Sequence, residues 1–168
     1  MNYHKITFPD VNNGNGCRVT LWVAGCSHHC EHCHNPQTWA FDSGKPFTEE
    51  TKERLFEALS IPYIDGLTLS GGEPCDSKKD IVPLMREVKE KFPDKDIWLY
   101  SGYTFEELCF NDFIIEGLVD YIVDGTYQHH KRDTSLAFRG SSNQRIFKKV
   151  DLCRGVCTYR QVDDSEFD

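Results

Sequence analysis

Three cysteines lie close together in the first quarter of the chain, at Cys26, Cys30 and Cys33, with three and then two residues between them. Thiolate is a soft ligand that selects zinc, copper(I) or iron–sulfur clusters. A structural zinc site is closed by four ligands, and a ferredoxin-type cluster takes four cysteines. The local run supplies only three. The spacing therefore predicts a [4Fe–4S] cluster with one iron that has no protein ligand and is open to a substrate.

A zinc site is the alternative that this spacing leaves open. A second cysteine pair, Cys153 and Cys157, would complete such a site, or a histidine from the same run would supply the fourth ligand; the candidates are His28, His29, His32 and His34. Cys153 and Cys157 also fit a second cluster, a redox pair or two idle thiols, of which we favour the last. Cys17, Cys75 and Cys109 are single and scattered, so we expect them to behave as small apolar residues.

A glycine-rich turn, Ser70-Gly71-Gly72-Glu73-Pro74, directly follows a short apolar segment. Two glycines let a ligand approach the backbone closely and leave amide and carbonyl groups accessible. Taken alone, the turn is typical of a plain connection from a strand to a helix. Beside an open iron, we interpret it as a cradle for the amino group of a substrate.

The rest of the chain alternates between strand and helix patterns. Helices are predicted over 48–59, which Thr48 would cap, and over 79–92, which Pro93 would end; Thr104 with Glu107 forms a capping box for a further helix. Strands are predicted over 18–24, 66–70, 96–100, 118–123 and 144–150. Such alternation indicates right-handed βαβ units and a mostly parallel sheet, which is the α/β class.

The chain is too short for a complete eight-fold barrel, which needs about 200 residues or more, so we expect a partial, open β/α barrel or an open sheet. In both architectures chemistry lies at the carboxyl ends of the parallel strands. Three motifs follow predicted strands: Cys26 to Cys33, Gly71-Gly72-Glu73 and Ser101-Gly102-Tyr103. Asp124 ends the fourth of these strands. The motifs should therefore meet in one active site.

The amino-acid composition limits the binding partners and the cellular location that we expect. The chain of 168 residues carries 19 Lys and Arg against 27 Asp and Glu, a formal net charge of −8. This balance argues against binding to nucleic acid and against adhesion to an anionic membrane. No run is long and apolar enough to span a bilayer, and the N-terminal residues lack a hydrophobic signal core. We expect a cytoplasmic protein, where eight cysteines favour metal or redox chemistry over disulfides.

The cysteine motif after one strand and Gly-Gly-Glu after the next resemble the radical S-adenosylmethionine superfamily. Within it, the chain is similar to the activating proteins of anaerobic ribonucleoside-triphosphate reductases, from its start to about Phe147. The segments that carry the similarity are Gly16-Cys17-Arg18 through Trp39, Lys45-Pro46-Phe47-Thr48, Leu69-Ser70-Gly71-Gly72-Glu73-Pro74, Asp96-Ile97-Trp98, Ser101-Gly102-Tyr103, Val123-Asp124-Gly125 and Arg139-Gly140-Ser141-Ser142-Asn143-Gln144-Arg145. By this resemblance, residues 1–168 form a single radical S-adenosylmethionine domain. Residues 151–168 extend beyond the family pattern, and we expect the acidic end from about Asp163 to fray.

The resemblance implies an activity as well as a fold. Cys26, Cys30 and Cys33 would bind three irons, and the amino and carboxylate groups of S-adenosylmethionine would chelate the fourth. One electron from the cluster, supplied by a donor such as a flavodoxin, would break the C5′–S bond to give methionine and a 5′-deoxyadenosyl radical. That radical would take a hydrogen atom from a glycine of the partner, an anaerobic ribonucleoside-triphosphate reductase.

The resemblance also implies contacts to the cofactor. His32 would stack near the adenine, and His34 would touch the cofactor through its backbone. The methionine amino end would meet Gly71, Gly72 and Glu73. Asp124 would bind ribose or amino groups, or else cap a turn. Two other functions remain open: activation of a different glycyl-radical enzyme, such as a formate lyase, whose activases tend to be longer, and a zinc-binding interaction module.

Overall fold

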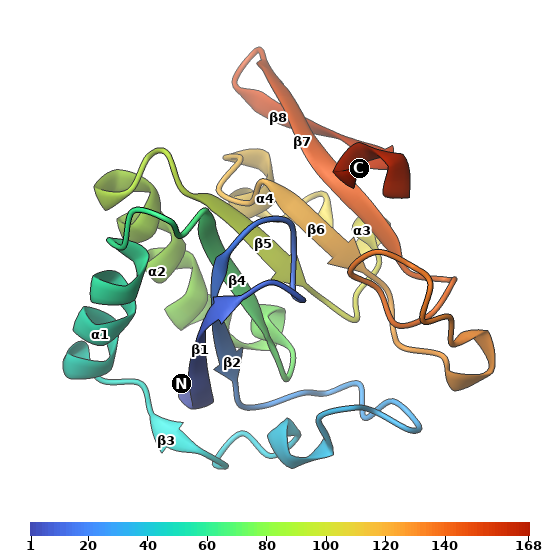
Figure 1. Ribbon diagram of the computed structural model, residues 1–168, viewed down its shortest axis with the longest axis horizontal. Helices are drawn as coiled ribbons and strands as arrows, with labels where there is room; N and C mark the ends of the chain where they lie inside the picture. The colour runs from blue at the N-terminus through green and yellow to red at the C-terminus, as the bar shows by residue number, and fades with distance from the viewer.

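A single eight-stranded sheet forms the centre of the computed structural model, which describes the backbone of residues 1–168 and every side chain except those of residues 151–153 (Figure 1). The strands are β1 (Asn2–Asp10), β2 (Arg18–Val23), β3 (Lys45–Pro46), β4 (Gly66–Gly71), β5 (Asp96–Tyr100), β6 (Tyr121–Asp124), β7 (Arg145–Cys153) and β8 (Val156–Val162). Their order across the sheet is β3-β1-β2-β4-β5-β6-β7-β8.

The middle of the sheet is parallel and its flanks are antiparallel. Strands β2, β4, β5 and β6 pair in parallel, whereas β1 pairs with β2, and β7 with β6, in antiparallel fashion. The predicted α/β class and the parallel core are therefore confirmed. The sequence did not reveal β1, β3 or β8, because their alternation of apolar and polar residues is weak and they lie towards the edges, where little of a strand is buried.

Helices begin where local capping signals place them. Helix α1 (Glu49–Leu59) starts after Thr48, whose side chain accepts a hydrogen bond from the Thr51 amide, and α2 spans Lys78–Lys91. The predicted capping box is present: Thr104 and Glu107 bond reciprocally at the start of α3 (Phe105–Leu108), and α4 follows at Asp112–Ile115. Short 3-10 helices cover Pro36–Thr38, Pro74–Ser77, His129–Lys131 and Asp164–Phe167.

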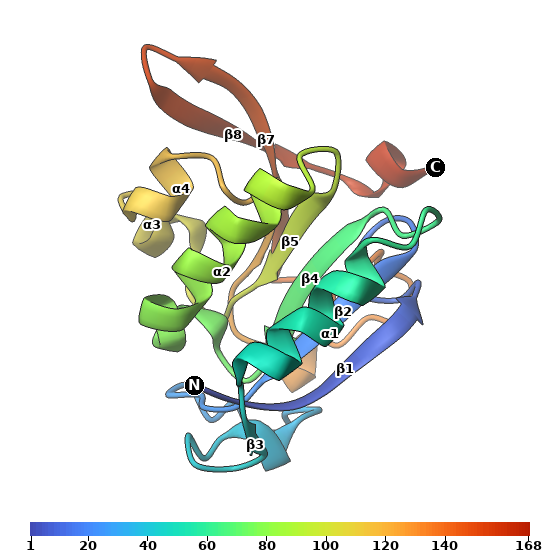
Figure 2. The same ribbon diagram turned by 90° about the vertical axis from the view of Figure 1, so that its left-hand side faces the viewer.

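The helices pack on one face of the sheet (Figure 2). The order β2-β4-β5-β6 never reverses, and right-handed connections between parallel strands then place every intervening helix on the same side. The main core lies between these layers and is formed by apolar residues of the helices and of the central strands, among them Leu21, Leu55, Leu69, Met85 and Leu99.

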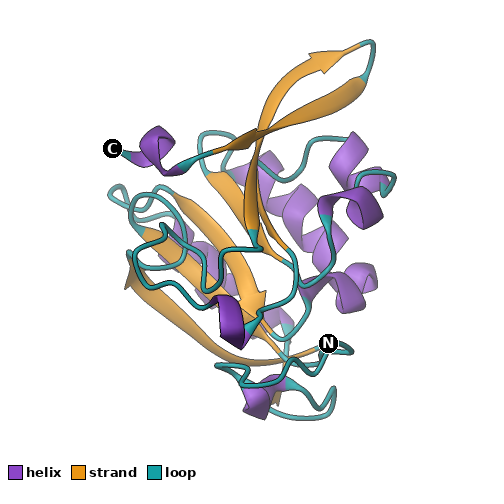
Figure 3. Ribbon diagram, turned by 90° about the vertical axis from the view of Figure 1, so that its right-hand side faces the viewer, coloured by secondary structure: helices purple, strands orange, loops and turns teal.

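The opposite face carries loops and short 3-10 helices instead of α-helices (Figure 3). Because successive side chains of a strand point to opposite faces, Ile97 and Leu99 join the main core while Trp98 between them lies in a second apolar cluster. That cluster contains Trp98, Val123, Ile146 and Val162, with Tyr100, Tyr121, Phe138 and Phe167 packed against it. This face therefore carries a second, smaller apolar cluster where the other face carries the α-helices.

The C-terminal part consists of a hairpin and a short helix. Strands β7 and β8 form a hairpin that projects from the body (Figure 1), and the end of the chain returns to the sheet. We expected fraying from Asp163. In the structure Asp163 accepts a hydrogen bond from the Ser165 amide, and the 3-10 helix Asp164–Phe167 brings the Phe167 ring to 5.6 Å from Trp98. The segment is mostly acidic, but one apolar residue, Phe167, packs against the sheet. Of the second cysteine pair, the Cys153 side chain lies outside the described residues.

None of the helices in the structure has the length and apolar character that crossing a bilayer requires, among the residues described.

Candidate active site

The cysteine-rich loop leaves β2 at Gly25 and is closed at its base. The Gly25 amide donates to the Thr38 carbonyl at 2.7 Å and the Cys26 amide to the Trp39 carbonyl at 3.0 Å. Gly25 has a φ of +97°, and a Cβ there would lie 2.2 Å from the Phe41 ring. The loop therefore depends on glycine where it departs from the strand, and its two ends are held together beside the end of β2.

The three cysteines of this loop line one cavity of about 520 Å³ at the carboxyl ends of the parallel strands. The turns after β4, β5 and β6 line the same cavity, so the structure brings together the motifs that the sequence singled out. The lining residues are Asn12, Asn13, Trp22, Cys26, His28, Cys30, Cys33, His34, Asn35, Ser70, Gly71, Gly72, Glu73, Tyr100, Ser101, Gly102, Val123, Gly125, Thr126, Tyr127, Leu136, Phe138, Arg139, Gly140 and Gln144.

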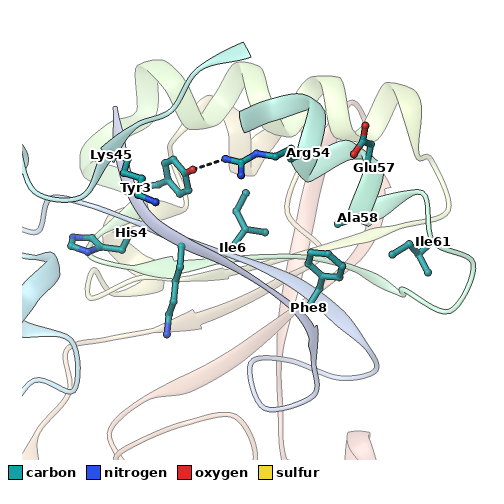
Figure 4. Close-up of a pocket in the computed structure, with 10 residues that line it drawn as sticks. Tyr3, His4, Ile6, Phe8, Lys45, Arg54, Glu57, Ala58 and Ile61 are labelled. Carbon is teal, nitrogen blue, oxygen red and sulfur yellow. Dashed lines mark hydrogen bonds between the residues drawn. The ribbon is translucent and has the colours of Figure 1, made fainter. Parts of the chain in front are cut away.

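A second cavity, of about 580 Å³, lies between β1 and α1 (Figure 4). Its wall includes Tyr3, whose hydroxyl accepts a hydrogen bond from Arg54 at 3.0 Å, together with Ile6 and Phe8. It is slightly larger than the first cavity, but no cysteine and no strand-end turn lines it. We therefore place the chemistry in the cavity that the cysteines line.

Backbone amides point at the sulfur atoms of the cysteine loop. The Asn35 amide donates to Cys33 Sγ at 3.3 Å. Burial raises the pKa of the Cys26 thiol, and the amides of the two residues after Ser27 oppose that rise. Burial likewise raises the pKa of Cys30, which the Tyr127 amide opposes. Such donors stabilise thiolates and tune iron–sulfur clusters.

The donor set, three thiols, suits an iron–sulfur cluster. Among the described residues, no three His, Cys, Asp or Glu side chains converge closely enough to hold one metal ion. In a [4Fe–4S] cube each cysteine binds a different iron, so the thiolates must be spread around one space. Cys26, Cys30 and Cys33 are all free and border the same cavity.

Glu73 connects the walls of the cavity. Its carboxylate is 1% exposed and accepts four hydrogen bonds. Oε2 accepts from His28 Nε2 at 2.9 Å and from the Gly102 amide at 2.6 Å. Oε1 accepts from Ser101 Oγ at 2.9 Å and from the Cys75 amide at 3.0 Å. One carboxylate thus joins the cysteine loop to the turns after β4 and β5.

His28 is the functional residue that the sequence did not single out beyond a possible zinc ligand. The hydrogen bond to Glu73 raises the pKa of His28, and burial acts against that rise. The imidazole also packs edge-on against Tyr103, with the ring centroids 4.5 Å apart. Its spacing between two cysteines gave no sign of a partner 45 residues further along the chain.

Glycines allow this close packing. A Cβ on Gly72 would lie 2.3 Å from the Gly25 carbonyl oxygen, and one on Gly102 would lie 2.5 Å from the His28 ring. Gly71 has a φ of +99°. The Glu73 amide donates to the Gly25 carbonyl at 2.8 Å, which fixes the turn to the base of the cysteine loop. The turn is therefore a backbone cradle that side chains would fill.

Not every residue expected to contact the cofactor lines the cavity. Gly71, Gly72, Glu73, Cys33 and His34 do. His32 and Asp124 are not among the lining residues. The side chain of the former is 58% exposed, and its ring lies 4.3 Å from the ring of His129. Its backbone has a φ of +58°, in the left-handed region.

Asp124 is buried, and its carboxylate is already engaged. Oδ2 accepts from Arg145 Nη2 at 2.5 Å and from the Phe105 amide at 2.7 Å, and Oδ1 accepts from the Arg145 amide at 3.0 Å. The antiparallel register between β6 and β7 places these two residues opposite one another. These contacts favour the capping role that the sequence left open for Asp124 over binding of ribose.

The polar stretch before β7 also borders the cavity. Gln144 Oε1 accepts from the Gly140 amide at 2.9 Å and from the Ser141 amide at 3.1 Å, while its Nε2 donates to the Gly125 carbonyl at 3.0 Å. Tyr127 lies 4.7 Å from His34, measured between ring centroids. The sequence marked this stretch only through the family resemblance, because polar loop residues show no periodicity from which a position could be predicted.

The other described cysteines lie elsewhere. Cys75 is buried in the main core, and burial raises its pKa well above the usual value. Cys157 Sγ lies 2.2 Å from where a Cβ on Gly117 would be. Gly117 precedes β6, whereas Cys26 follows β2. Because these strands run parallel, Gly117 lies at their amino ends and Cys26 at their carboxyl ends. Cys157 therefore does not complete a four-ligand site with the cysteine loop.

Comparison with known proteins places the chain in a family. A family model described as a 4Fe-4S single cluster domain matches residues 12–147. An anaerobic ribonucleoside-triphosphate reductase-activating protein of Enterobacteria phage T4 is 44% identical over 153 residues, which cover 90% of this chain and 96% of that protein. Proteins of the same name are 39% identical in Escherichia coli K12, over 87% and 97% of the two chains, and 40% identical in Vibrio cholerae, over 88% and 98%. The chain belongs to the family of anaerobic ribonucleoside-triphosphate reductase-activating proteins.

Proposed function

We propose that this protein activates an anaerobic ribonucleoside-triphosphate reductase by forming a glycyl radical on it, using S-adenosylmethionine and a [4Fe–4S] cluster. The relatives are named for this activation, and they match nearly the whole chain. The observation that carries the proposal is that Cys26, Cys30 and Cys33 line one cavity with the Gly71-Gly72 turn. Ligands for a cluster and a backbone cradle for its substrate therefore share one space.

Cys26, Cys30 and Cys33 would hold the cluster, and its fourth iron would bind S-adenosylmethionine. When bound, the cluster supplies the electron that splits the C5′–S bond. The protein contributes the amides that face the sulfur atoms, from Asn35 to Cys33 and from Tyr127 to Cys30. It also limits water around them, since all three cysteines are partly buried.

S-adenosylmethionine would meet the turn after β4 through the backbone. Glu73 already accepts four hydrogen bonds within the protein, so its carboxylate fixes the shape of the turn. The Gly72 amide donates to the Val23 carbonyl at 2.9 Å, so the Gly72 carbonyl is the group that would meet the methionine amino end of the molecule. His34, which lines the cavity, would contact the cofactor. We place His32 and Asp124 outside the contact with S-adenosylmethionine, because His32 is exposed and the Asp124 carboxylate is paired with Arg145.

The 5′-deoxyadenosyl radical attacks most C–H bonds, so the target glycine must lie close and water must stay out. Leu136 and Phe138 give one wall of the cavity an apolar surface, and Phe138 packs against the apolar cluster on the side of the sheet opposite the α-helices. We propose that residues 1–168 form one radical S-adenosylmethionine domain with the sheet as an open barrel. The partner's glycine loop would enter at the open side, and a one-electron donor such as a flavodoxin would reduce the cluster.

The test is activation itself. The anaerobically purified and reduced protein is mixed with S-adenosylmethionine and an anaerobic ribonucleotide reductase, and the glycyl radical is counted by electron paramagnetic resonance. We expect a signal on the reductase and none on a formate lyase. A signal on the lyase alone would overturn the choice of partner. One zinc per chain, with no cleavage of S-adenosylmethionine, would overturn the proposal as a whole.

Two cysteine variants test the ligand assignment. Cys30→Ala should lose both iron and radical formation, because two cysteines do not hold the cube in this geometry. Cys109→Ala is the matched control, since the Cys109 thiol lies outside the cavity and donates to the Glu106 carbonyl at 3.4 Å. It should keep its iron. Full activity in Cys30→Ala would show that the ligands are assigned wrongly.

A further inference from the structure

The C-terminal segment, residues 163–168, lies beyond the part of the chain that the family model matches. It returns to the face of the sheet opposite the α-helices and contacts the loop of residues 133–140. We infer that the C-terminal segment positions this loop as a wall of the active-site cavity and thereby couples cleavage of S-adenosylmethionine to radical formation on the partner. The inference rests on the function proposed above.

The loop of residues 133–140 is part of the cavity and has little structure of its own. Leu136, Phe138, Arg139 and Gly140 line the cavity. The loop forms neither strand nor helix, and Phe138 has a φ of +56°, which is unfavourable for a residue with a bulky side chain. Other elements must therefore hold it in place. Tyr100 supplies one contact, because its hydroxyl donates to the Phe138 carbonyl at 2.8 Å.

Asp164 of the C-terminal segment supplies the charged contacts. Its Oδ2 accepts from the Ala137 amide at 3.1 Å, and its Oδ1 pairs with the Arg139 guanidinium. The Arg139 side chain is only 11% exposed, and its further acceptors are the carbonyls of Ala137 and Gln144. Within the described part of the chain, Asp164 is the only carboxylate paired with Arg139. A cation buried to this extent is costly without a partner.

Phe167 supplies the apolar contacts. Its ring lies edge-on to the Phe138 ring, with centroids 5.2 Å apart, and 5.6 Å from Trp98. Phe138 in turn lies edge-on to Trp98 at 5.2 Å. The three rings form one contact between the loop, the segment and β5. The segment therefore holds three consecutive loop residues, 137 to 139, by a hydrogen bond, an aromatic contact and an ion pair.

A wall that moves would matter most after the 5′-deoxyadenosyl radical has formed. That radical reacts with the hydrogen atom that lies closest, so a displaced wall favours quenching over transfer from the target glycine. The segment should therefore affect the number of glycyl radicals obtained per 5′-deoxyadenosine released. It should not affect the iron content, because none of its residues contacts the cysteine loop in the hydrogen bonds and ring contacts described for it.

The test compares Asp164→Asn with the matched control Glu166→Gln in the full-length, cluster-loaded protein. Both change one carboxylate of the same short helix, but Glu166 pairs with Lys148 and Arg160 and not with the loop. We expect Asp164→Asn to lower the ratio of glycyl radical to 5′-deoxyadenosine at least about threefold, with iron per chain unchanged. Glu166→Gln should match the wild type, and Asp164→Glu should recover part of the ratio.

Amide hydrogen exchange gives a readout that does not depend on activity. Asp164→Asn should raise exchange at Ala137 and Phe138, whereas Glu166→Gln should not. An unchanged ratio or unchanged exchange in Asp164→Asn would overturn the inference, as would an equal loss in Glu166→Gln or a loss of iron in Asp164→Asn. Failure of the proposed function looks different, because the wild type itself would then form no radical on the reductase.

Discussion

Two strand-end turns look alike in the sequence and differ in the structure. The turn after β4 contains Gly71, Gly72 and Glu73, and the turn after β6 contains Asp124 and Gly125. Each holds a carboxylate that is 1% exposed, and each lies at the carboxyl end of a parallel strand. The carboxylate of the first turn is held by donors around the cavity. That of the second is paired with a guanidinium on the neighbouring strand.

The difference shows that the partners of a buried carboxylate, and not its burial, decide its role. Glu73 bonds to His28, Ser101 and Gly102, so it shapes three walls of the site at once. Asp124 bonds to Arg145, which also pairs with the exposed Glu106. It therefore fastens β7 and the start of α3 to β6. Changes at the first turn should alter chemistry, whereas changes at the second should alter stability.

The largest effect is expected from Glu73→Gln. The amide nitrogen that replaces one carboxylate oxygen would face the donors of that oxygen, which include the Gly102 N–H at Oε2 or the Cys75 N–H at Oε1. A buried donor without an acceptor forces the turn to shift. Displacement of the cradle should reduce radical formation about a hundredfold. Spin counting on the reductase measures this, and iron analysis serves as the control. Activity within a few-fold of wild type would show that Glu73 is not needed to hold the turn after β4 in shape.

Gly102→Ala should have the next largest effect. The added Cβ would lie 2.5 Å from the His28 ring and push it away from Glu73. We expect about a tenfold loss of radical formation, comparable to removing one well-placed contact. A double-mutant cycle isolates the cause, because His28→Ala leaves room for the new methyl group. If Gly102→Ala costs as much in the His28→Ala background as in wild type, the two residues do not act together.

Asp124→Asn should separate the second turn from the chemistry. The substitution leaves Arg145 with a weaker acceptor while the pair with Glu106 persists, so the free energy of unfolding should fall by about 1–3 kcal/mol. Radical formation at a temperature where the variant is folded should stay within about twofold of wild type. Thermal denaturation tests the expected loss of stability, and spin counting tests the expected retention of radical formation. Weakened binding of S-adenosylmethionine without loss of stability would show that Asp124 contacts the cofactor.

The smallest effect is expected at Glu106, where pH is the probe. The hydrogen bonds from Arg145 lower the pKa of Glu106 to about 2. Because the folded pKa lies below the unfolded value of about 4.3, this pair stabilises the protein above that value and is lost as the pH falls towards 2. Glu106→Gln should flatten the pH dependence of the melting temperature in this window. Salt should have the same effect, since the pair is exposed. An unchanged profile would mean that Asp124 alone holds Arg145.

The sequence by itself determined the parts of this protein that depend on residues close along the chain. Cysteine spacing singled out three residues that line one cavity, and the capping residues Thr48 and Thr104 set the starts of α1 and α3. Apolar runs predicted the central strands, because a strand buried on both faces shows in its own composition. Parallel strands align their carboxyl ends, so even the meeting of the motifs after β2, β4 and β5 followed from the pattern.

Tertiary structure alone decided which groups pair across long stretches of the chain. Glu73 finds His28 and Asp124 finds Arg145 only because the strand order and register bring them together. His32 does not line the cavity, and its left-handed backbone conformation is not revealed by its residue type. Phe167 anchors an acidic tail that composition alone would leave loose. Local signals act over a few residues, whereas these contacts exist only after the sheet has formed.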